Sequence, residues 1–210
     1  MERVMKSIGK YIVGIDEVGR GPLAGPVVLA TVAFPRGLRL RAGGGRVPLK
    51  DSKKLTAIQR ALWADYLINH KKIFFSLSSA APKTIDRINV ARAANGAALR
   101  AFKKLSKIHH IKSNTYAIYL DGGLYLGNRK ARDIPAKTMV RADEKITAVK
   151  AASVIAKVHR DRIMVHAAKR YPQYGFEVHK GYGTKKHREA IRKHGPSSIH
   201  RLTFIKNHIS

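Results

Sequence analysis

Residues 11–28 read YIVGIDEVGRGPLAGPVV, a short apolar run that ends in two carboxylates and a glycine-rich turn before a second apolar run begins. We expect a strand on each side of this turn, the second reaching Phe34. Asp16 and Glu17 are adjacent acids, which repel each other and gain nothing from an apolar core. A divalent cation bound at the strand end would explain both of them.

The rest of the chain alternates between strand-like and helical patterns, which predicts an α/β class with a mixed sheet. A helix over 57–69 follows Thr56, a suitable N-cap. Residues 36–50 form a basic, glycine-rich segment that fits a hairpin and a mobile insertion equally well. Further strands are expected at 73–78, 116–120 and 137–140, and further helices at 84–105, over a long stretch that ends near 170, and at 185–194.

Charge narrows the class of partner. The chain has 42 Lys and Arg against 13 Asp and Glu, a formal net charge of +29. Such a surface attracts polyanions, with nucleic acid the first candidate and an anionic membrane surface the second. No long uncharged apolar stretch predicts a membrane span, and the N-terminal residues do not resemble a secretory leader. The absence of cysteine excludes disulfides and thiol catalysis and makes the cytoplasm the expected location.

Acids stand at the ends of three strand-like runs: Asp16 and Glu17, then Asp121, then Asp143. Strand ends on one edge of an open α/β sheet converge, and oxygen ligands from several of them suit Mg²⁺ or Mn²⁺. Each acid alone could be a solvated strand end or a turn former, but together they favour a metal site. Because strand neighbours point to opposite faces, Asp16 and Glu17 can share this site only where the strand ends or bulges.

Asp161 is excluded from this set by geometry. It lies 18 residues after Asp143, about 27 Å if the segment is helical, whereas paired metal ions lie about 4 Å apart. We expect Asp161 to pair with Arg160 or Arg162, or to cap a loop. Alanines 148, 151, 152 and 156 are expected in the core, as are Trp63 and the pair at 74–75. The histidines are expected mostly on the surface or in loops.

Ordered motifs from Tyr11 to Phe204 resemble those of the ribonuclease HII family. The segment from Gly14 to Val28 resembles its opening motif, and 51–55, 85–89 and 120–122 resemble the next three. Asp143 with 151–158 and 160–162, then 179–184, 195–197 and 200–201, resemble the remaining ones. A single motif would be weak evidence, but this ordered set is specific.

This resemblance implies a ribonuclease H-like fold over one domain, residues 1–210, with a catalytic α/β core at about 10–170. A helical C-terminal part at about 171–210 would contact substrate. It also implies a monomer that uses two Mn²⁺ or Mg²⁺ ions to cleave RNA in RNA–DNA hybrids, and DNA duplexes 5′ of a single ribonucleotide, as in ribonucleotide excision repair. Cleavage would leave 5′-phosphate and 3′-hydroxyl ends.

The site residues implied by the resemblance are four catalytic and metal-binding acids and five substrate-binding residues. The acids are Asp16, Glu17, Asp121 and Asp143. The substrate-binding residues are Gly19, Arg20, Gly21, Lys53 and Tyr182. Tyr182 is expected to be exposed on a glycine-flanked loop and to sense the RNA-to-DNA junction.

Several alternatives stay open. Arg20 could hold a phosphate or pair with Glu17, and Gly19 and Gly21 could serve only a tight turn. Glu144 stands where the family commonly has a small residue; it could add an acid near the metal site, but solvent is favoured. Two rival functions are a non-catalytic basic RNA-binding protein, which leaves the acids unexplained, and a Holliday-junction or hybrid-only nuclease of the same fold.

Overall fold

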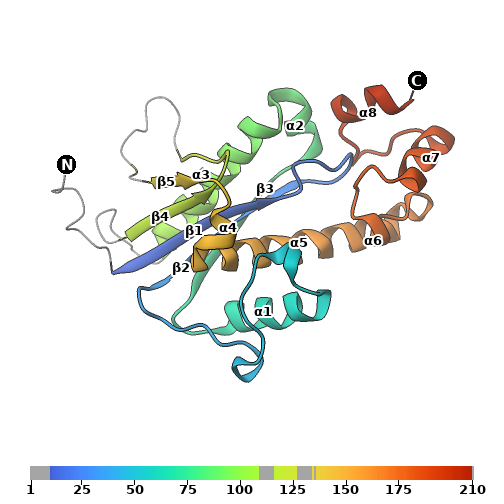
Figure 1. Cartoon of the computed structure of the whole chain (residues 1–210). Helices are drawn as coiled ribbons and strands as arrows, with labels where there is room; N and C mark the ends of the chain where they lie inside the picture. The colour runs from blue at the N-terminus through green and yellow to red at the C-terminus, as the bar shows by residue number, and fades with distance from the viewer. Residues whose placement is uncertain (1–9, 109–115, 127–133, 135, 210) are drawn as a thin grey trace.

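The computed structural model describes residues 10–108, 116–126, 134 and 136–209. A five-stranded mixed sheet, in the order β3-β2-β1-β4-β5, forms its centre (Figure 1). The strands are β1 (Tyr11–Val18), β2 (Val27–Pro35), β3 (Phe74–Ala80), β4 (Tyr116–Asp121) and β5 (Ala136–Met139). β1 and β2 are antiparallel, as are β2 and β3, whereas β1, β4 and β5 are mutually parallel. The C-terminal ends of the three parallel strands therefore share one edge.

Helices cover both faces of this sheet. Helices α2 (Pro82–Ile88) and α3 (Val90–Ile108) lie on one side, where apolar side chains of α3 pack on β1, β2 and β4. Helices α1 (Ala57–Asn69) and α5 (Thr147–Arg170) lie on the other, with Trp63 fully buried between them and the sheet. Because β2 is buried along almost its whole length, it reads as one continuous apolar run.

Helix α5 crosses β1 at unusually short range. A Cβ added to Gly14 would lie 2.1 Å from the carbonyl carbon of Ala148, so only glycine fits. The facing residues Ala148, Ala151 and Ala152 are fully buried, as expected from the sequence. This contact fixes the start of α5 against the middle of β1, two residues before Asp16.

The C-terminal part packs on the far end of α5 (Figure 1). It contains the turn Pro172–Tyr174 and helices α6 (Phe176–His179), α7 (Lys185–His194) and α8 (Leu202–Ile209). Apolar residues of this part form a third cluster with Leu23, Ala24 and Met164. The turn between β1 and β2 is thus packed against the C-terminal part.

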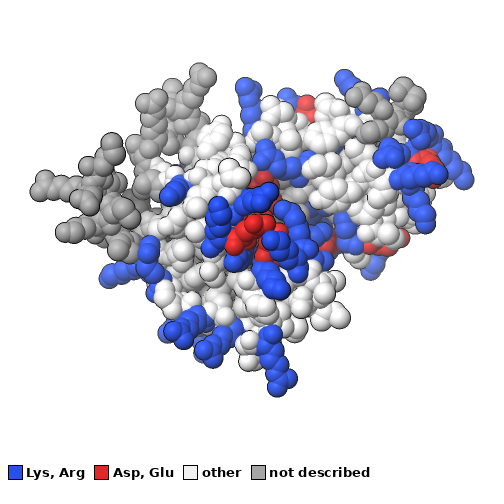
Figure 2. Space-filling view, viewed as in Figure 1, with Lys and Arg blue, Asp and Glu red and all other residues white. Residues whose placement is uncertain are grey.

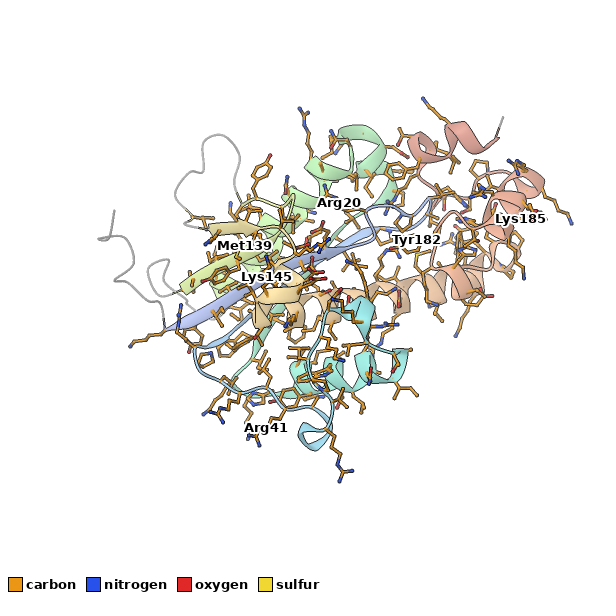
Figure 3. The ribbon with its side chains drawn as sticks, in the orientation of Figure 1. Arg20, Arg41, Met139, Lys145, Tyr182 and Lys185 are labelled. Atoms are coloured by element: carbon orange, nitrogen blue, oxygen red, sulfur yellow. The ribbon has the colours of Figure 1, made fainter. Side chains whose placement is uncertain are left out.

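The basic segment 36–50 forms an ordered loop over the α1 side of the sheet. Ala42 bridges to Val47 around a 3-10 turn, Gly43–Gly45, so a small hairpin-like turn is present. Leu38, Leu40 and Leu49 pack on the apolar cluster beneath, while Arg39, Arg41 and the other cations of the loop are exposed. Figure 3 places Arg41 well away from Tyr182.

Two expectations need correction, and one helix was missed. The helix expected over 84–105 is two helices, because Asn89 adopts a φ of 65° and its side chain caps α3 by accepting from the Arg92 N–H. Asp143 does not end a strand: β5 stops at Met139, and Asp143 lies on the short helix α4 (Ala142–Lys145). Helix α8 lies in the part expected to be helical, but its position was not predicted.

The helices 57–69 and 185–194 are confirmed at both ends. Thr56 caps the first through a capping box with Gln59. Among the described residues, no helix combines the length and the apolar composition that a membrane span requires.

Candidate active site

The C-terminal ends of β1 and β4, together with helix α4, bring four carboxylates together. We call Asp16, Glu17, Asp121 and Asp143 the acidic edge. Asp16 and Glu17 lie near the end of β1, and Asp121 ends the neighbouring strand β4. The Asp121 carboxylate accepts a 2.8 Å hydrogen bond from the Ala142 N–H, which fixes the start of α4 and so places Asp143. In Figure 2 a small red patch, surrounded by blue Lys and Arg, faces the viewer at the centre of the molecule.

Asp16 is almost fully buried, with 4% of its surface exposed. Burial raises the pKa of its carboxyl well above the usual value, and the charges of Glu17 and Asp121 raise it further. The side chain of Ser153, on α5, opposes this shift only in part. An ionised Asp16 therefore lacks adequate compensation within the protein itself.

Glu17 is held on one side only. Its Oε1 accepts a 3.0 Å hydrogen bond from the Arg20 guanidinium, which confirms the ion-pair alternative for Arg20. Its Oε2 is buried and has no hydrogen-bond partner among the described residues. Burial raises the pKa of Glu17, against the lowering effect of Arg20. A buried acceptor without a partner is costly, so Oε2 marks a position for an absent donor or cation.

Asp143 faces the same region from α4. Burial raises the pKa of its carboxyl, and the charges of Asp121 and Asp51 add to the effect. Lys53 lies 3.5 Å from its Oδ2 but is itself 80% exposed, so this ion pair is weak. Lys53 thus lies beside the acids on an exposed side chain that a phosphate could reach.

Two cavities open around these side chains and share Asp121 and Lys53. One, of about 240 Å³, is lined by Asp16, Glu17, residues 18–21, Ser52, Lys53, Asp121, Ser153, Lys157 and Tyr182. The other, of about 550 Å³, reaches Asp143, Glu144 and Asp51. All nine predicted site residues line one cavity or the other.

Sequence reasoning missed several residues at this edge. Asp51 is buried and caps a 3-10 turn, Ser52–Lys54, that presents Lys53 to the acids. Ser153 and Lys157 reach the cavity from α5. No strand-end pattern marks residues in the middle of a helix, although the helical period places 153 and 157 on one face.

Two further acids, Asp161 and Glu144, each pair with a lysine instead of joining the acidic edge. Asp161 pairs with Lys157 at 2.8 Å, one helical turn away, so the expected pairing with Arg160 or Arg162 is wrong. Glu144 is exposed and pairs with Lys54 at 3.1 Å, in agreement with the favoured solvent position.

The segment after β1 brings a glycine loop, residues 19–26, over the acids. Gly19 has a φ of 91°, and a Cβ there would lie 2.2 Å from the Arg160 Nε, so Gly19 is required by the protein itself. Gly21 has no atom within 4 Å of its Cβ position. The bare surface at Gly21 is therefore available to a ligand rather than used for packing.

Tyr182 lies on a second loop, residues 180–184, which we call the tyrosine loop. Its side chain is 45% exposed, as expected, and it faces the cavity (Figure 3). The Leu23 N–H donates to the Gly181 carbonyl at 2.8 Å, so the tyrosine loop is bonded directly to the glycine loop. The two substrate-contact segments expected from the sequence thus form one continuous wall.

Two histidines of the C-terminal part are exceptions to the expectation that the histidines lie mostly on the surface or in loops. His187 and His200 are buried, and their Nε2 atoms lie 3.0 Å apart. His187 Nδ1 lies 2.9 Å from the Tyr182 carbonyl, and His179 stacks on His187. Burial lowers the pKa of both His187 and His200 to about 4, so both are neutral at pH 7. Histidine is polar enough to predict a surface position, and only the tertiary packing shows otherwise.

The acidic edge fits a divalent cation by its chemistry. It offers hard carboxylate oxygens, a Glu17 Oε2 with no hydrogen-bond partner among the described residues, and three acids whose pKa values are raised mainly by burial and further by neighbouring acids. In the arrangement described, no three carboxylates or imidazoles converge as closely as one ion requires. A bound cation would offset the charge of these buried carboxylates.

Comparison with known proteins decides the family. The family model described as Ribonuclease HII matches residues 13–207. The chain belongs to the ribonuclease HII family. A curated ribonuclease HII of Pelodictyon phaeoclathratiforme is 44% identical over 193 residues, covering 92% of this chain and 88% of that protein. Ribonuclease HII enzymes cleave RNA in RNA–DNA hybrids, and this chain is accordingly a hydrolytic endoribonuclease of a family in which metal dependence is typical.

Solved structures confirm the ribonuclease H-like fold. The ribonuclease H2 of Pyrococcus horikoshii superposes with a TM-score of 0.70 at 25% identity, covering 95% of this chain and 97% of that one. Bst-RNase HIII in complex with Mn²⁺ superposes with the same TM-score at 19% identity, covering 95% and 68% of the two chains. The second likeness concerns the fold alone.

Proposed function

We propose that this ribonuclease HII uses two divalent cations, Mn²⁺ or Mg²⁺, to cleave RNA in hybrids and to cut duplex DNA 5′ of a single embedded ribonucleotide. The products would carry 5′-phosphate and 3′-hydroxyl ends. One observation carries the proposal: buried acids with an unpartnered Oε2 on Glu17 share a cavity with the Gly19–Gly21 segment and Tyr182. Mn²⁺ is bound in the solved structure of Bst-RNase HIII, a protein of the same fold.

The acidic edge would hold the cations through Asp16, Glu17, Asp121 and Asp143. When bound there, divalent cations neutralise the scissile phosphate, activate a water and stabilise the leaving oxygen. The protein's own contribution is placement: β1 and β4 fix three of the acids, and the Asp121 bond to the Ala142 N–H fixes the fourth. Lys53, with its ammonium group exposed, would contact a neighbouring phosphate.

The glycine loop would read the 2′-hydroxyl. The backbone at Gly21 is open to the cavity, which lets a ribose approach its N–H closely. Gly21→Ala tests this role because the added methyl meets no protein atom. We expect unchanged thermal stability but much slower cleavage. Gly19→Ala is the contrasting variant, since it should destabilise the fold by clashing with Arg160.

Tyr182 would read the deoxyribose on the other side of the junction. Its exposed ring, held by bonds through its N–H to His179 and its carbonyl to Thr184, can pack on a sugar where a 2′-hydroxyl would crowd it. Together the two loops would test for a 2′-hydroxyl at one nucleotide and for its absence at the next.

We further propose that residues 10–170 form the catalytic core and that residues 171–210 contact substrate through the tyrosine loop. The continuous wall of the two loops supports this division, because substrate in the cavity would touch both parts.

One assay tests the function. A DNA duplex with a single ribonucleotide is incubated with the protein in EDTA, Mg²⁺ or Mn²⁺, beside an RNA–DNA hybrid and an all-DNA duplex. We expect cleavage of the first two in either metal, none in EDTA, and a cut 5′ of the ribonucleotide. Cleavage of the hybrid alone would favour a hybrid-only nuclease, and binding without cleavage in any metal would favour a basic RNA-binding protein.

A further inference from the structure

Two arginines lie entirely inside the protein beneath the substrate loops. Arg160, on α5, and Arg201, just before α8, have no exposed surface. Neither forms an ion pair with a carboxylate in the part of the chain that the structure describes. Burying a charge in this way is unfavourable unless every N–H finds an acceptor, so their contacts must serve a purpose. We call this pair the arginine clamp.

Within the described residues, all the hydrogen bonds of the Arg201 side chain go to carbonyls of the glycine loop. Its Nη1 donates to Arg20 O at 2.7 Å, and its Nη2 donates to Gly19 O at 2.5 Å and Gly25 O at 2.9 Å. Its Nε donates to the same Gly25 carbonyl at 3.0 Å. A side chain about 180 positions along the chain thus fixes both ends of the loop that follows β1.

Arg160 joins the glycine loop to the tyrosine loop. Its Nε donates to Pro26 O at 3.0 Å and its Nη2 to Ala24 O at 3.1 Å, both in the glycine loop. Its Nη1 donates to Lys180 O at 2.9 Å, at the start of the tyrosine loop. Its guanidinium carbon lies 6.0 Å from the centre of the Tyr182 ring. One planar group therefore sets the spacing between the two loops.

These bonds determine which way the backbone amides face. In a planar trans peptide the N–H points opposite to the carbonyl of the preceding residue. Because Arg201 holds the carbonyls of Gly19 and Arg20 inward, the N–H groups of Arg20 and Gly21 face outward. Both residues line the cavity, and neither N–H donates to a backbone or side-chain acceptor within the described residues. Successive outward N–H groups form a concave surface that accepts anions and hydroxyl oxygens.

We propose that the arginine clamp positions the Arg20 and Gly21 amides, and their spacing from Tyr182, so that the cavity reads a 2′-hydroxyl. The clamp touches no substrate and acts through the loops. This inference rests on the proposed 2′-hydroxyl recognition and extends it to two residues on distant elements. Burial lowers the pKa of Arg201 to about 9, so the group stays cationic at neutral pH and keeps all its donors.

The test is a double-mutant cycle between the protein and the substrate. Two RNA–DNA hybrids are compared, one all-RNA and one with a single deoxynucleotide, and cleavage is measured at the phosphate 5′ of that position. Removing one 2′-hydroxyl should slow the wild type at this phosphate by about tenfold or more. In Arg201→Lys the all-RNA rate should fall by about ten- to a hundredfold, and the ribo-to-deoxy ratio should collapse toward one.

Lysine keeps the charge but cannot reach three carbonyls from one planar group, which makes Arg201→Lys the informative variant. Arg201→Gln, which keeps two donors without the charge, is a second variant should the first fold poorly. Leu67→Ala, a fully buried change on α1, is the control for lost stability. Arg100→Lys is the control for a remote arginine that donates to a backbone carbonyl, that of Ser79. Both controls should keep the wild-type ratio.

The possible failures are distinguishable. Suppose that the wild type cleaves the all-RNA hybrid much faster than the hybrid with one deoxynucleotide, and that Arg201→Lys or Arg201→Gln keeps the same ratio of rates. That result would overturn the proposed role of the arginine clamp and leave the proposed function intact. A wild-type ratio near one would contradict the reading of the 2′-hydroxyl itself, and the clamp with it. Half-saturating Mn²⁺ should be unchanged in the clamp variants, since the acids are not altered; a large shift would assign Arg201 to the metal site instead.

Discussion

The acidic edge and the arginine clamp both adjoin the glycine loop, and both bury charge. At the clamp, every guanidinium donor described above meets a carbonyl of the protein. At the acidic edge, the pKa values of three acids are raised, and one carboxylate oxygen has no hydrogen-bond partner in the part of the chain that the structure describes. A buried charged group whose hydrogen bonds are all made to the protein holds the structure in place. A buried charged group that lacks partners indicates a binding site for a ligand. The comparison therefore separates residues that position the site from residues that bind.

The largest effect on cleavage is expected when a carboxylate of the acidic edge is removed. Asp16→Asn keeps the shape of the side chain but removes a cation ligand. We expect hybrid cleavage in Mn²⁺ to fall by at least about a hundredfold, because charge stabilisation at the reacting phosphate is lost. Asp121→Asn should behave alike. Asp65→Asn, an exposed acid on α1, is the matched control and should retain wild-type turnover.

A Tyr182 variant tests whether the tyrosine loop recognises the RNA-to-DNA junction. Tyr182→Ala should slow cleavage at a single ribonucleotide by about ten- to a hundredfold, since a stacking contact of 1–3 kcal/mol is lost. Cleavage within a long hybrid should fall less. Rates on both substrates are measured side by side under single-turnover conditions. Equal losses, or none, would show that the ring does not distinguish the junction.

The buried histidines His187 and His200 should make the free energy of unfolding depend on pH. The folded-state pKa of His187 and His200 is about 4, below the ordinary 6.5. Stability is therefore complete above about pH 6.5 and is lost as the pH falls toward 4, because the unfolded chain takes up protons first. Between pH 7 and 5 the free energy of unfolding should fall by about 2 kcal/mol for each histidine. Urea unfolding at both pH values measures this.

His187→Gln should reduce that pH dependence, since a glutamine does not titrate. His166→Gln alters an exposed histidine on α5 and should leave the dependence unchanged. An unaltered slope in His187→Gln would mean that the buried pair does not govern acid sensitivity.

The melting temperature without metal should show whether the buried carboxylates of the acidic edge destabilise the protein. Burial and Glu17 raise the pKa of Asp16, so the stability present below its ordinary value of 3.8 is lost as the pH rises through the raised value. At pH 7 without metal, Asp16→Asn should therefore melt higher than the wild type, by about 2–4 °C for each kcal/mol relieved. Adding Mn²⁺ should raise the melting temperature of the wild type more than that of the variant. Calorimetry with and without metal gives both values.

The smallest effect is expected at the exposed loop 36–50, which lies outside both regions. Deleting 41–46 would remove the buried Ala42, so replacing Arg39, Arg41 and Arg46 by Gln is the cleaner change. If these side chains touch phosphates, the slope of log affinity against log salt should become shallower by about 0.9 for each lost contact. Cleavage at low salt should persist. An unchanged slope would show that the loop does not contact nucleic acid.

Local chemistry was enough to predict much of the fold. The apolar runs, the Thr56 cap and the glycine at position 195 predicted the helices 57–69 and 185–194, because these signals lie within a few residues of the ends they specify. The helix over 84–105 was predicted without its break, because asparagine only sometimes adopts a positive φ. Helix α8 was missed because its cap is distant: the Asp86 carboxylate accepts from the Leu202 and Thr203 N–H groups.

The sequence by itself determined the chemistry of this protein: a scarce set of acids after apolar runs, glycines beside them, and a large positive charge to attract a polyanion. These are properties of residue type and order, so they can be read without coordinates. Only the tertiary structure decided which charges are satisfied. Arg201 donates to carbonyls of residues 19–25, and Glu17 Oε2 has no hydrogen-bond partner among the described residues. Both facts depend on segments that packing brings together, and no local sequence pattern encodes such distant contacts.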